Sequence, residues 1–477
     1  MIARLLEEAP ADRPALSAGD QLLSYGDLRA LSARMEEQFS AAGDLRGERV
    51  ALISPNAPGL VAGLFAAWRL GAVAVPLSSR LRERELELML ADAEPVVVWS
   101  VAAHGGYSFA DVLPGLLPST VRVLHITGVR PLVRTEVASG MSEPAALDGE
   151  AIAAILYTSG TTGIPKGVLV KHVREVEGAR FLAETLRLGA HDRCGLIVPI
   201  SHAFGLTLLH ATVAAAAEGI LVDSSFSPAP LLRALEARDA TVLHGSPTLF
   251  RTLLKSRPDG IPGIRTGLVA GAPCPPDLLE ALDEHGTRIL NCYGLSETGA
   301  VTCVRLDDPP ERRHTTVGRV APQYEARVTD GELEVRGPHL TPGYYRRPEE
   351  TAQAFRDGWF RTGDLAEIED GYVSIVGRAK ELVHVGGFNV VPAEVEAVLL
   401  AHPDVANAAV LGVPDERMGE ALAAYVSPRP GAELDPKALI AFASSRIAGY
   451  KVPYAIEILP ELPLLPSGKP DRKALAR

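Results

Sequence analysis

One segment of the sequence concentrates the groups that bind phosphate, and it reads Tyr157-Thr-Ser-Gly-Thr-Thr-Gly-Ile-Pro-Lys-Gly167. It follows an apolar run, residues 152–156, that predicts a buried strand. Glycines let backbone N–H groups approach a ligand closely, hydroxyls add short donors, and Lys166 adds a cation. An ordinary polar turn rarely combines so many of these groups, so the segment predicts a phosphate-binding loop.

The loop differs from the P-loop of nucleotide hydrolases. The pattern GxxxxGK[ST] is absent, because Lys166 follows Pro165 and neither Ser nor Thr comes after it. We therefore expect a different phosphate cradle, whose members are Thr158, Ser159, Gly160, Thr161, Thr162, Gly163 and Lys166.

Further motifs follow the loop along the chain. They are Gly271-Ala-Pro273, Tyr293-Gly-Leu-Ser-Glu-Thr-Gly299, Tyr345-Arg-Arg-Pro348, Trp359-Phe-Arg-Thr-Gly-Asp364, Gly377-Arg-Ala-Lys-Glu381, Gly386-Gly-Phe-Asn389 and Pro466-Ser-Gly-Lys469. In this order they resemble the adenylate-forming superfamily of acyl-CoA synthetases, adenylation domains and luciferases, across essentially the whole chain. The run GGFNVVPAEVE is most similar to acyl- or aryl-CoA ligases. The resemblance implies ATP-dependent joining of a carboxylic acid to AMP, release of pyrophosphate, and transfer of the acyl group to a thiol.

The resemblance also assigns catalytic roles. Adenylation brings a carboxylate to the α-phosphate of ATP, so the site must neutralise developing negative charge. By resemblance, Lys469 contacts both reacting groups and Glu297 holds Mg²⁺, while Thr162 and Thr298 donate to phosphate oxygens. A lysine in a tail such as PSGKPDRK is ordinarily a solvated charge, but its place after Pro-Ser-Gly favours the catalytic role.

Nucleotide and thiol contacts come from the same resemblance. Tyr293 offers a ring to adenine, Asp364 can accept both ribose hydroxyls, and Arg378 adds a ribose or phosphate contact. A turn-capping role for Asp364 is compatible with this. The remaining nucleotide contacts are expected from Gly271, Ala272, Pro273 and Gly294, and the passage for a pantetheine arm from Gly386 and Gly387, which a simple tight turn would explain nearly as well.

Alignment with the family places an acyl pocket whose walls are mostly apolar. Ala203 cannot pair an α-ammonium group and Cys292 cannot pair a second carboxylate, so amino acids and malonate are disfavoured. The expected substrate is an aryl, arylacrylic or short-to-medium aliphatic monocarboxylic acid. The pocket residues are Ala203, Phe204, Thr207, His244, Leu268, Ala270, Cys292, Ala300 and Val301.

Two histidines need separate interpretation. His244 could bond a substrate hydroxyl or carbonyl, or it could be satisfied by neighbouring backbone. His202, in ISHAFG, matches the family's aromatic gate between the acyl pocket and the nucleotide. It is not expected to act as a base, because a carboxylate substrate is already ionised at neutral pH.

The elements that must position these residues follow an α/β pattern. Strand-like runs such as GERVALISPN and GAVAVPLS alternate with helical ones, which predicts helix-covered, largely parallel sheets. We expect a large N-terminal domain, residues 1–377, with subdomains of about 1–150, 151–322 and a small β-rich 323–377. The resemblance further implies a hinge at 378–382 that leads to a small mobile α+β lid domain, 383–477. Lys380 would be its pivot, although a plain surface lysine is also compatible with that position.

Composition limits which partners the protein can bind and in which compartment it is expected. The 477 residues carry a formal net charge of -12, which argues against nucleic-acid binding. The four scattered cysteines form no CxxC pair, and the acidic start lacks the apolar stretch of a signal peptide. No apolar run is long enough to cross a membrane, so a cytoplasmic enzyme is expected.

Several functions remain open at this stage. Free coenzyme A is the leading acyl acceptor, and the phosphopantetheine arm of a carrier protein is the alternative. A luciferase-like oxidation is more remote. A degenerate nucleotide sensor is disfavoured, because Lys469, Glu297 and the phosphate loop are intact.

Overall fold

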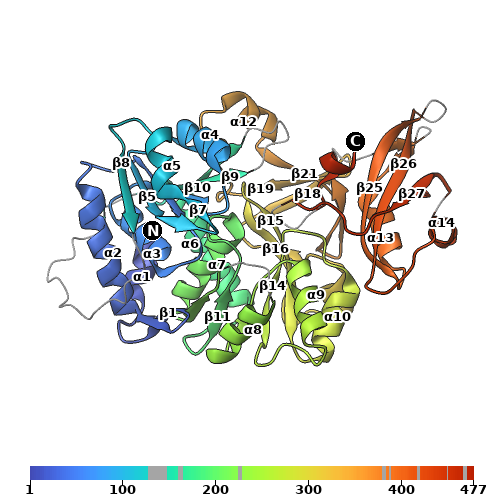
Figure 1. The fold of residues 1–477 in the computed structure, drawn as a ribbon, viewed down its shortest axis with the longest axis horizontal. Helices are drawn as coiled ribbons and strands as arrows, with labels where there is room; N and C mark the ends of the chain where they lie inside the picture. The colour runs from blue at the N-terminus through green and yellow to red at the C-terminus, as the bar shows by residue number, and fades with distance from the viewer. Residues whose placement is uncertain are drawn as a thin grey trace. The chain divides into compact units, whose positions relative to one another are not determined.

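The computed structural model describes residues 1–126, 145, 148–158, 165–223, 228–378, 383–385, 388–415, 419–447, 449–465 and 470–476 (Figure 1). The chain divides into two compact units. The first comprises Met1–His314, Gly318–Glu325 and Arg336–Phe360, and the second comprises Thr315–Val317, Ala326–Val335 and Arg361–Arg477.

The first unit contains a sheet with strand order β10-β9-β4-β3-β5-β8. All neighbours are parallel except the edge pair β9–β10. In β3, Ala51 and Ile53 face the helices α4 and α5, whereas Val50 and Leu52 face the opposite core, so both faces are covered and the strand is apolar throughout. The bounds are β3 (Arg49–Ser54), β4 (Val73–Ser78), β5 (Val97–Val101), β8 (Arg122–Ile126), β9 (Ile152–Thr158), β10 (Lys166–Lys171), α4 (Glu83–Ala93) and α5 (Phe109–Leu116).

A second sheet of this unit has the order β2-β1-β12-β11-β13-β14-β15-β16-β17. Its strands from β1 to β15 are parallel, and β2, β16 and β17 are antiparallel to their neighbours. The bounds are β1 (Pro14–Ala18), β2 (Gln21–Ser24), β11 (Arg193–Leu196), β12 (Glu218–Leu221), β13 (Val242–Leu243), β14 (Thr266–Val269), β15 (Arg288–Leu295), β16 (Gly299–Cys303) and β17 (Arg319–Val320).

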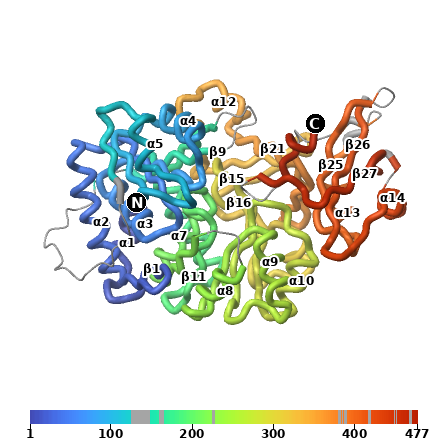
Figure 2. The backbone as a smooth tube through the Cα atoms, in the orientation of Figure 1, coloured from blue at the N-terminus to red at the C-terminus, as the bar shows by residue number. Residues whose placement is uncertain are grey.

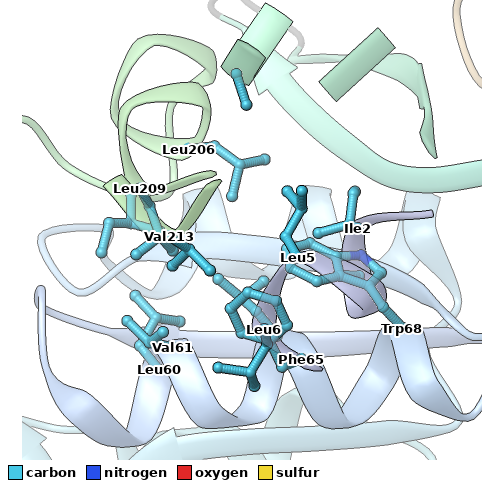
Figure 3. Close-up of a cluster of buried hydrophobic side chains, with 14 of the residues drawn as sticks. Ile2, Leu5, Leu6, Leu60, Val61, Phe65, Trp68, Leu206, Leu209 and Val213 are labelled. Atoms are coloured by element: carbon cyan, nitrogen blue, oxygen red, sulfur yellow. The ribbon is translucent and has the colours of Figure 1, made fainter. Parts of the chain in front are cut away.

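A layer of helices fills the space between the two sheets (Figures 1 and 2). Figure 3 shows part of its core, where Leu6 of α1, Phe65 of α3 and Leu209 of α7 are buried together. The layer consists of α1 (Ile2–Glu8), α2 (Tyr25–Ser40), α3 (Pro58–Arg69), α6 (His172–Thr185) and α7 (Ala203–Ala214). The other face of the second sheet is covered by α8 (Pro228–Ala237), α9 (Pro247–Ser256) and α10 (Pro276–Glu284).

The remaining elements include the strands of the second unit. Most of β18, β19, β21 and β22 lies in the second unit, where these strands neighbour one another in that order. The C-terminal sheet has the order β24-β23-β26-β25, with β27 parallel to β26. The bounds are β6 (Ala103–His104), β7 (Tyr107–Ser108), α11 (Pro310–Thr315), β18 (Glu325–Thr329), β19 (Glu332–Arg336), α12 (Pro348–Ala354), β20 (Phe355–Arg356), β21 (Trp359–Glu369), β22 (Tyr372–Arg378), β23 (Val383–Val385), β24 (Phe388–Val390), α13 (Pro392–Leu400), β25 (Val405–Asp415), β26 (Gly419–Pro428), α14 (Pro436–Ser444), the 3₁₀ turn Gly449–Lys451, β27 (Ala455–Ile458) and α15 (Arg472–Leu475).

The architecture confirms the predicted α/β class, with a large N-terminal part built on sheets and a smaller C-terminal part. Strands on both sides of residue 150 share the first sheet, since Ala74 of β4 pairs with Ala154 of β9. Residues 379–382 lie outside the described residues, so the hinge at 378–382 stays a prediction. Among the residues described, no helix is long and apolar enough to span a bilayer.

Candidate active site

The predicted site residues of the first unit converge at one edge of its second sheet. His244 directly follows β13, Gly271 follows β14, and Tyr293 lies near the end of β15. His202 ends the connection from β11 to α7 and is the N-terminal cap of that helix. Because these strands are parallel neighbours, their carboxyl ends meet at the same edge, where α/β sheets bind their ligands.

Glu297 and Thr298 lie in the tight turn that joins β15 to β16. Within the turn, the backbone N–H of Leu295 donates to Oγ1 of Thr298 at 3.0 Å, and that hydroxyl donates to the carbonyl of Gly299 at 2.9 Å. A Cβ atom on Gly294 would lie 2.0 Å from the Gly299 carbonyl oxygen, and Gly299 itself has φ +70°. The turn therefore requires both glycines, and the Thr298 hydroxyl, expected to donate to phosphate, is engaged inside it.

The side chain of Glu297 is held by a residue that the motif analysis missed. The hydroxyl of Tyr344 donates to Oε1 of Glu297 at 2.9 Å, and Nζ of Lys166 lies 5.4 Å from the centroid of the Tyr344 ring. Burial, together with the charge of Glu297, raises the pKa of Tyr344, so the phenol stays protonated and can donate. A tyrosine directly before the Tyr345-Arg-Arg-Pro348 motif was the only sequence signal for it.

The donor set at Glu297 suits Mg²⁺. No cluster of three or more His, Cys, Asp or Glu ligands occurs among the described residues, so a metal cage made entirely of protein is not found there. Mg²⁺ in nucleotide sites is characteristically held by one or two carboxylates together with substrate phosphates. A single carboxylate oriented by Tyr344, whose ring also lies beside Lys166, fits that mode.

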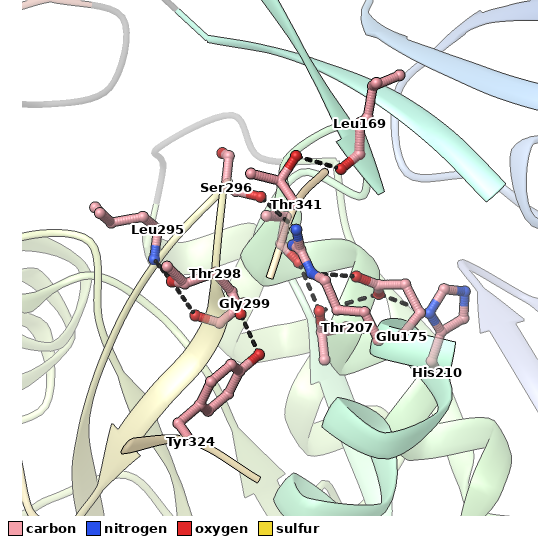
Figure 4. Close-up of polar contacts among 12 residues, drawn as sticks. Leu169, Glu175, Thr207, His210, Leu295, Ser296, Thr298, Gly299, Tyr324 and Thr341 are labelled. Carbon is pink, nitrogen blue, oxygen red and sulfur yellow. Dashed lines mark hydrogen bonds and ion pairs between the residues drawn. The ribbon is translucent and has the colours of Figure 1, made fainter. Parts of the chain in front are cut away.

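Other segments of the first unit hold the backbone of this turn (Figure 4). The Tyr324 hydroxyl donates to the carbonyl of Thr298, and the backbone N–H of Thr341 donates to the carbonyl of Glu297 at 2.8 Å. Nη1 of Arg174, on α6, donates to the carbonyl of Ser296 at 2.6 Å. Three separate segments of the chain thus hold the backbone of the turn.

The predicted acyl pocket is largely apolar in the structure. Leu268 and Val301 are fully buried, and Cys292 is nearly so. The partly buried lining residues pack against the large core, and they are Ala203, Phe204, Ala270 and Ala300.

Thr207 turns toward α6. Its hydroxyl lies 3.1 Å from Oε2 of Glu175, and its methyl group would be 3.4 Å from a Cβ added to Gly178. Both ends of the threonine side chain are therefore in contact with α6.

His244 is neutral and has one nitrogen engaged. Its Nδ1 accepts a hydrogen bond from the backbone N–H of Leu268 at 3.2 Å, which places the proton on Nε2. Burial lowers the pKa of His244 to about 3. Nε2 is buried and has no hydrogen-bond partner among the described residues.

His202 and the pair of cysteines at 292 and 303 also belong to this region. Loss of hydration next to the surrounding protein, together with the positive charge of Arg80, lowers the pKa of His202. The imidazole is therefore neutral at neutral pH. Cys292 pairs across the β15–β16 ladder with Cys303, and both are free thiols. The hydrogen bond between them and the burial of Cys303 raise the pKa of that thiol.

In the second unit, the two residues expected at the ribose bond each other. Asp364 of β21 lies opposite Arg378 of β22, and Nε of Arg378 is 2.8 Å from Oδ1 of the buried Asp364. The arginine orients the carboxylate and occupies one of its two oxygens.

Several predicted residues are not described. Thr158 ends β9 and Lys166 begins β10, and the intervening loop lies outside the described residues. The predictions for this loop and for the C-terminal region therefore stay predictions for Ser159, Gly160, Thr161, Thr162, Gly163, Lys380, Gly386, Gly387 and Lys469.

Similarity to known proteins agrees with this geometry. The chain matches the AMP-binding enzyme family over residues 3–345 and the AMP-binding enzyme C-terminal domain over residues 394–469. A feruloyl-CoA synthase of Amycolatopsis sp is 32% identical over 481 residues, covering 95% of this chain and 94% of its own length. A 2-succinylbenzoate–CoA ligase of Geobacillus kaustophilus is 34% identical over 489 residues, covering 98% and 95%. The crystal structure of ATP-bound MatB from Rhodopseudomonas palustris has a TM-score of 0.90 at 31% identity, covering 100% of this chain and 97% of that chain.

The carboxyl edge of a parallel sheet, where these residues meet, is the usual place for ligand binding in α/β enzymes. The chain belongs to the AMP-binding enzyme family. By class it is an AMP-forming acid–thiol ligase, which confirms the resemblance to the adenylate-forming superfamily.

Proposed function

We propose that this enzyme converts an aryl, arylacrylic or short-to-medium aliphatic monocarboxylic acid to acyl-AMP and then to its coenzyme A thioester. The observation that carries the proposal is the convergence at one sheet edge. There, the oriented carboxylate of Glu297 and the apolar residues Leu268, Cys292 and Val301 lie on or between neighbouring strands. One site would therefore hold the phosphates next to Glu297 and the acyl group next to the apolar residues.

In the first half-reaction, a carboxylate oxygen attacks the α-phosphorus of ATP and the bond to the bridging oxygen breaks, releasing pyrophosphate. The chain's part is to place two anions together, which needs cationic and hydrogen-bond donors such as Lys166 and, by resemblance, Lys469. In the second half-reaction, the thiol sulfur attacks the acyl carbonyl and AMP leaves. Neither step needs His202 as a base for the acid.

Glu297 would hold Mg²⁺, which when bound offsets the negative charge of the phosphates. Tyr344 orients that carboxylate by hydrogen bonding to one oxygen, which leaves the other free to bind. For the ribose, we propose Asp364, with Arg378 fixing its orientation.

The pocket supports a monocarboxylic acid with at most one polar substituent. Ala203 and Cys292 supply no charge for an ammonium group or a second carboxylate. The buried Nε2–H of His244 would be left unpaired by a purely apolar acyl group, which favours an acid with one hydroxyl or carbonyl oxygen. The relative named feruloyl-CoA synthase supports an arylacrylic acid of this kind.

The test is mass-spectrometric product detection with ATP, Mg²⁺ and a panel of aryl, arylacrylic and aliphatic acids, with and without coenzyme A. Acyl-CoA formed from one class of monocarboxylic acid supports the proposal. Acyl-AMP that accumulates without thioester would favour a carrier protein as the acceptor. No adenylate from any monocarboxylic acid would overturn the substrate assignment.

A further inference from the structure

The turn that bears Glu297 depends on a buried arginine that none of the predicted site motifs contains. Arg174 lies on α6, with about 2% of the residue exposed, and its Nη1 donates to the carbonyl of Ser296 at 2.6 Å. Ser296 directly precedes Glu297 in the sequence. A shift of this carbonyl therefore moves the backbone from which the Glu297 carboxylate projects.

Arg174 also limits where the turn can lie. A Cβ atom on Gly299, at the other end of the turn, would be 3.2 Å from Nε of Arg174. The guanidinium thus bonds to the turn at Ser296 and lies where it would crowd any side chain at Gly299.

A buried guanidinium needs a counter-ion, and Glu175 supplies it. Oε1 of Glu175 lies 3.6 Å from Nε of Arg174, and both side chains are almost completely buried. Burial alone would raise the pKa of Glu175. The hydrogen bond from His210 and the charge of Arg174 outweigh burial and hold that pKa below its ordinary value, so the carboxylate is ionised.

The counter-ion is itself fixed by α7. Nδ1 of His210 lies 3.0 Å from Oε2 of Glu175, and the Thr207 hydroxyl lies 3.1 Å from the same oxygen (Figure 4). A chain of polar contacts therefore runs from α7 through Glu175 and Arg174 to the carbonyl of Ser296.

From this we infer that Arg174 is a positioning residue for the metal-binding carboxylate of Glu297, with Glu175 as the counter-ion that fixes the guanidinium. The inference rests on the proposed function, because it assumes that Glu297 holds Mg²⁺ for adenylation. It assigns Arg174 no contact with substrate. Its effect is on the Mg²⁺ requirement of the first half-reaction.

The experiment measures ATP–pyrophosphate exchange against Mg²⁺ concentration for the wild type, Arg174→Lys and Arg174→Met. Both variants should raise the half-saturating Mg²⁺ concentration, Arg174→Met by about 10-fold or more and Arg174→Lys by less, since a lysine can still donate one hydrogen bond. Thioester formation from synthetic acyl-AMP and coenzyme A, without ATP, should stay within about twofold of wild type.

Two comparisons separate positioning from simple stabilisation. The double variant Arg174→Met/Glu175→Met removes both charges, so it should recover thermal stability lost in Arg174→Met but keep the raised Mg²⁺ requirement. Arg69→Lys is the matched control, since Arg69 is equally buried and paired with Glu7 and Glu36, away from the turn. It should leave the Mg²⁺ dependence unchanged.

An unchanged Mg²⁺ dependence in Arg174→Met and Arg174→Lys, with an active wild type, would overturn the inference and leave the proposed function standing. Recovery of both stability and Mg²⁺ dependence in the double variant would also overturn it, because Arg174 would then serve only to balance Glu175. A wild type that shows no exchange with any acid would overturn the proposed function and this inference together.

Discussion

The hydroxyl of Tyr344 donates a hydrogen bond to Oε1 of Glu297 at 2.9 Å, across 47 positions of sequence. The contact fixes the rotamer of a carboxylate whose backbone is already held by the β15–β16 turn. Because the second carboxylate oxygen stays available, the arrangement suits a ligand that takes one oxygen from the protein and the rest from phosphates.

Tyr344→Phe should lower ATP–pyrophosphate exchange by about 10-fold and raise the Mg²⁺ concentration needed for half-maximal rate. Only one oxygen atom is removed, so the melting temperature should change little. The measurement is the exchange rate at several Mg²⁺ concentrations. Tyr454→Phe serves as the control, because Tyr454 is 65% exposed. Equal Mg²⁺ curves for wild type and Tyr344→Phe would show that the hydroxyl does not orient a metal ligand.

Local patterns of the sequence were sufficient to predict the sheets, and the motif that contains the turn stood out by its residues. The apolar run of β3 and the glycines at 294 and 299 are constrained by their immediate surroundings, so type and spacing reveal them. The residues that hold Glu297 in place were not predictable in this way. Arg174 contacts Ser296 across 122 positions, and Tyr324 contacts Thr298 across 26, through packing of elements that no local pattern encodes.

The interpretation of pocket residues shows the same limit. Placement of Thr207 in the acyl pocket followed from the family motif on α7, but its hydroxyl is directed at Glu175 on a neighbouring helix. For His244 the sequence left two interpretations open, and the structure supports the backbone interpretation for one of the two ring nitrogens. One nitrogen is satisfied by the Leu268 backbone, and the other remains a buried donor.

His244→Leu should reduce the preference for acids that carry a hydroxyl or carbonyl oxygen. The buried Nε2–H would bind a ligand that accepts its hydrogen bond more tightly, because leaving a buried donor unpaired costs about 1–3 kcal/mol. The ratio of kcat/KM for 4-hydroxycinnamate over cinnamate should therefore fall by about 10-fold. An unchanged ratio, with both rates reduced equally, would indicate that His244 serves only the backbone of β14.

Acid should destabilise the first unit through two buried histidines. Burial lowers the pKa of His172 to about 4 and that of His244 to about 3, from an ordinary value near 6.5. Between these values the unfolded chain binds more protons than the folded one, so stability is fully present above pH 6.5 and falls as pH decreases toward 4.

The slope should approach about 1.4 kcal/mol per pH unit for each histidine. Denaturant unfolding at pH 7, 6 and 5 measures it, because most carboxylates titrate below this range. His172→Gln and His244→Gln should each flatten the curve. His191→Gln is the control, since the His191 side chain is 81% exposed. A slope that survives both buried substitutions would place the acid sensitivity elsewhere.

Gly299→Ala should impair adenylation through two separate effects that a double variant can resolve. Gly299 has φ +70°, which a Cβ atom strains, and the new Cβ would lie 3.2 Å from Nε of Arg174. The backbone strain persists whatever the neighbour, whereas the contact with Nε is lost when Arg174 is replaced by methionine. Because the new Cβ would lie against Arg174, the effects of Gly299→Ala and Arg174→Met on the exchange rate should be non-additive by about 0.5 kcal/mol or more in the double variant. Additive losses would mean that Arg174 and the Gly299 end of the turn act independently, and that Arg174 acts on Glu297 through the contact at Ser296.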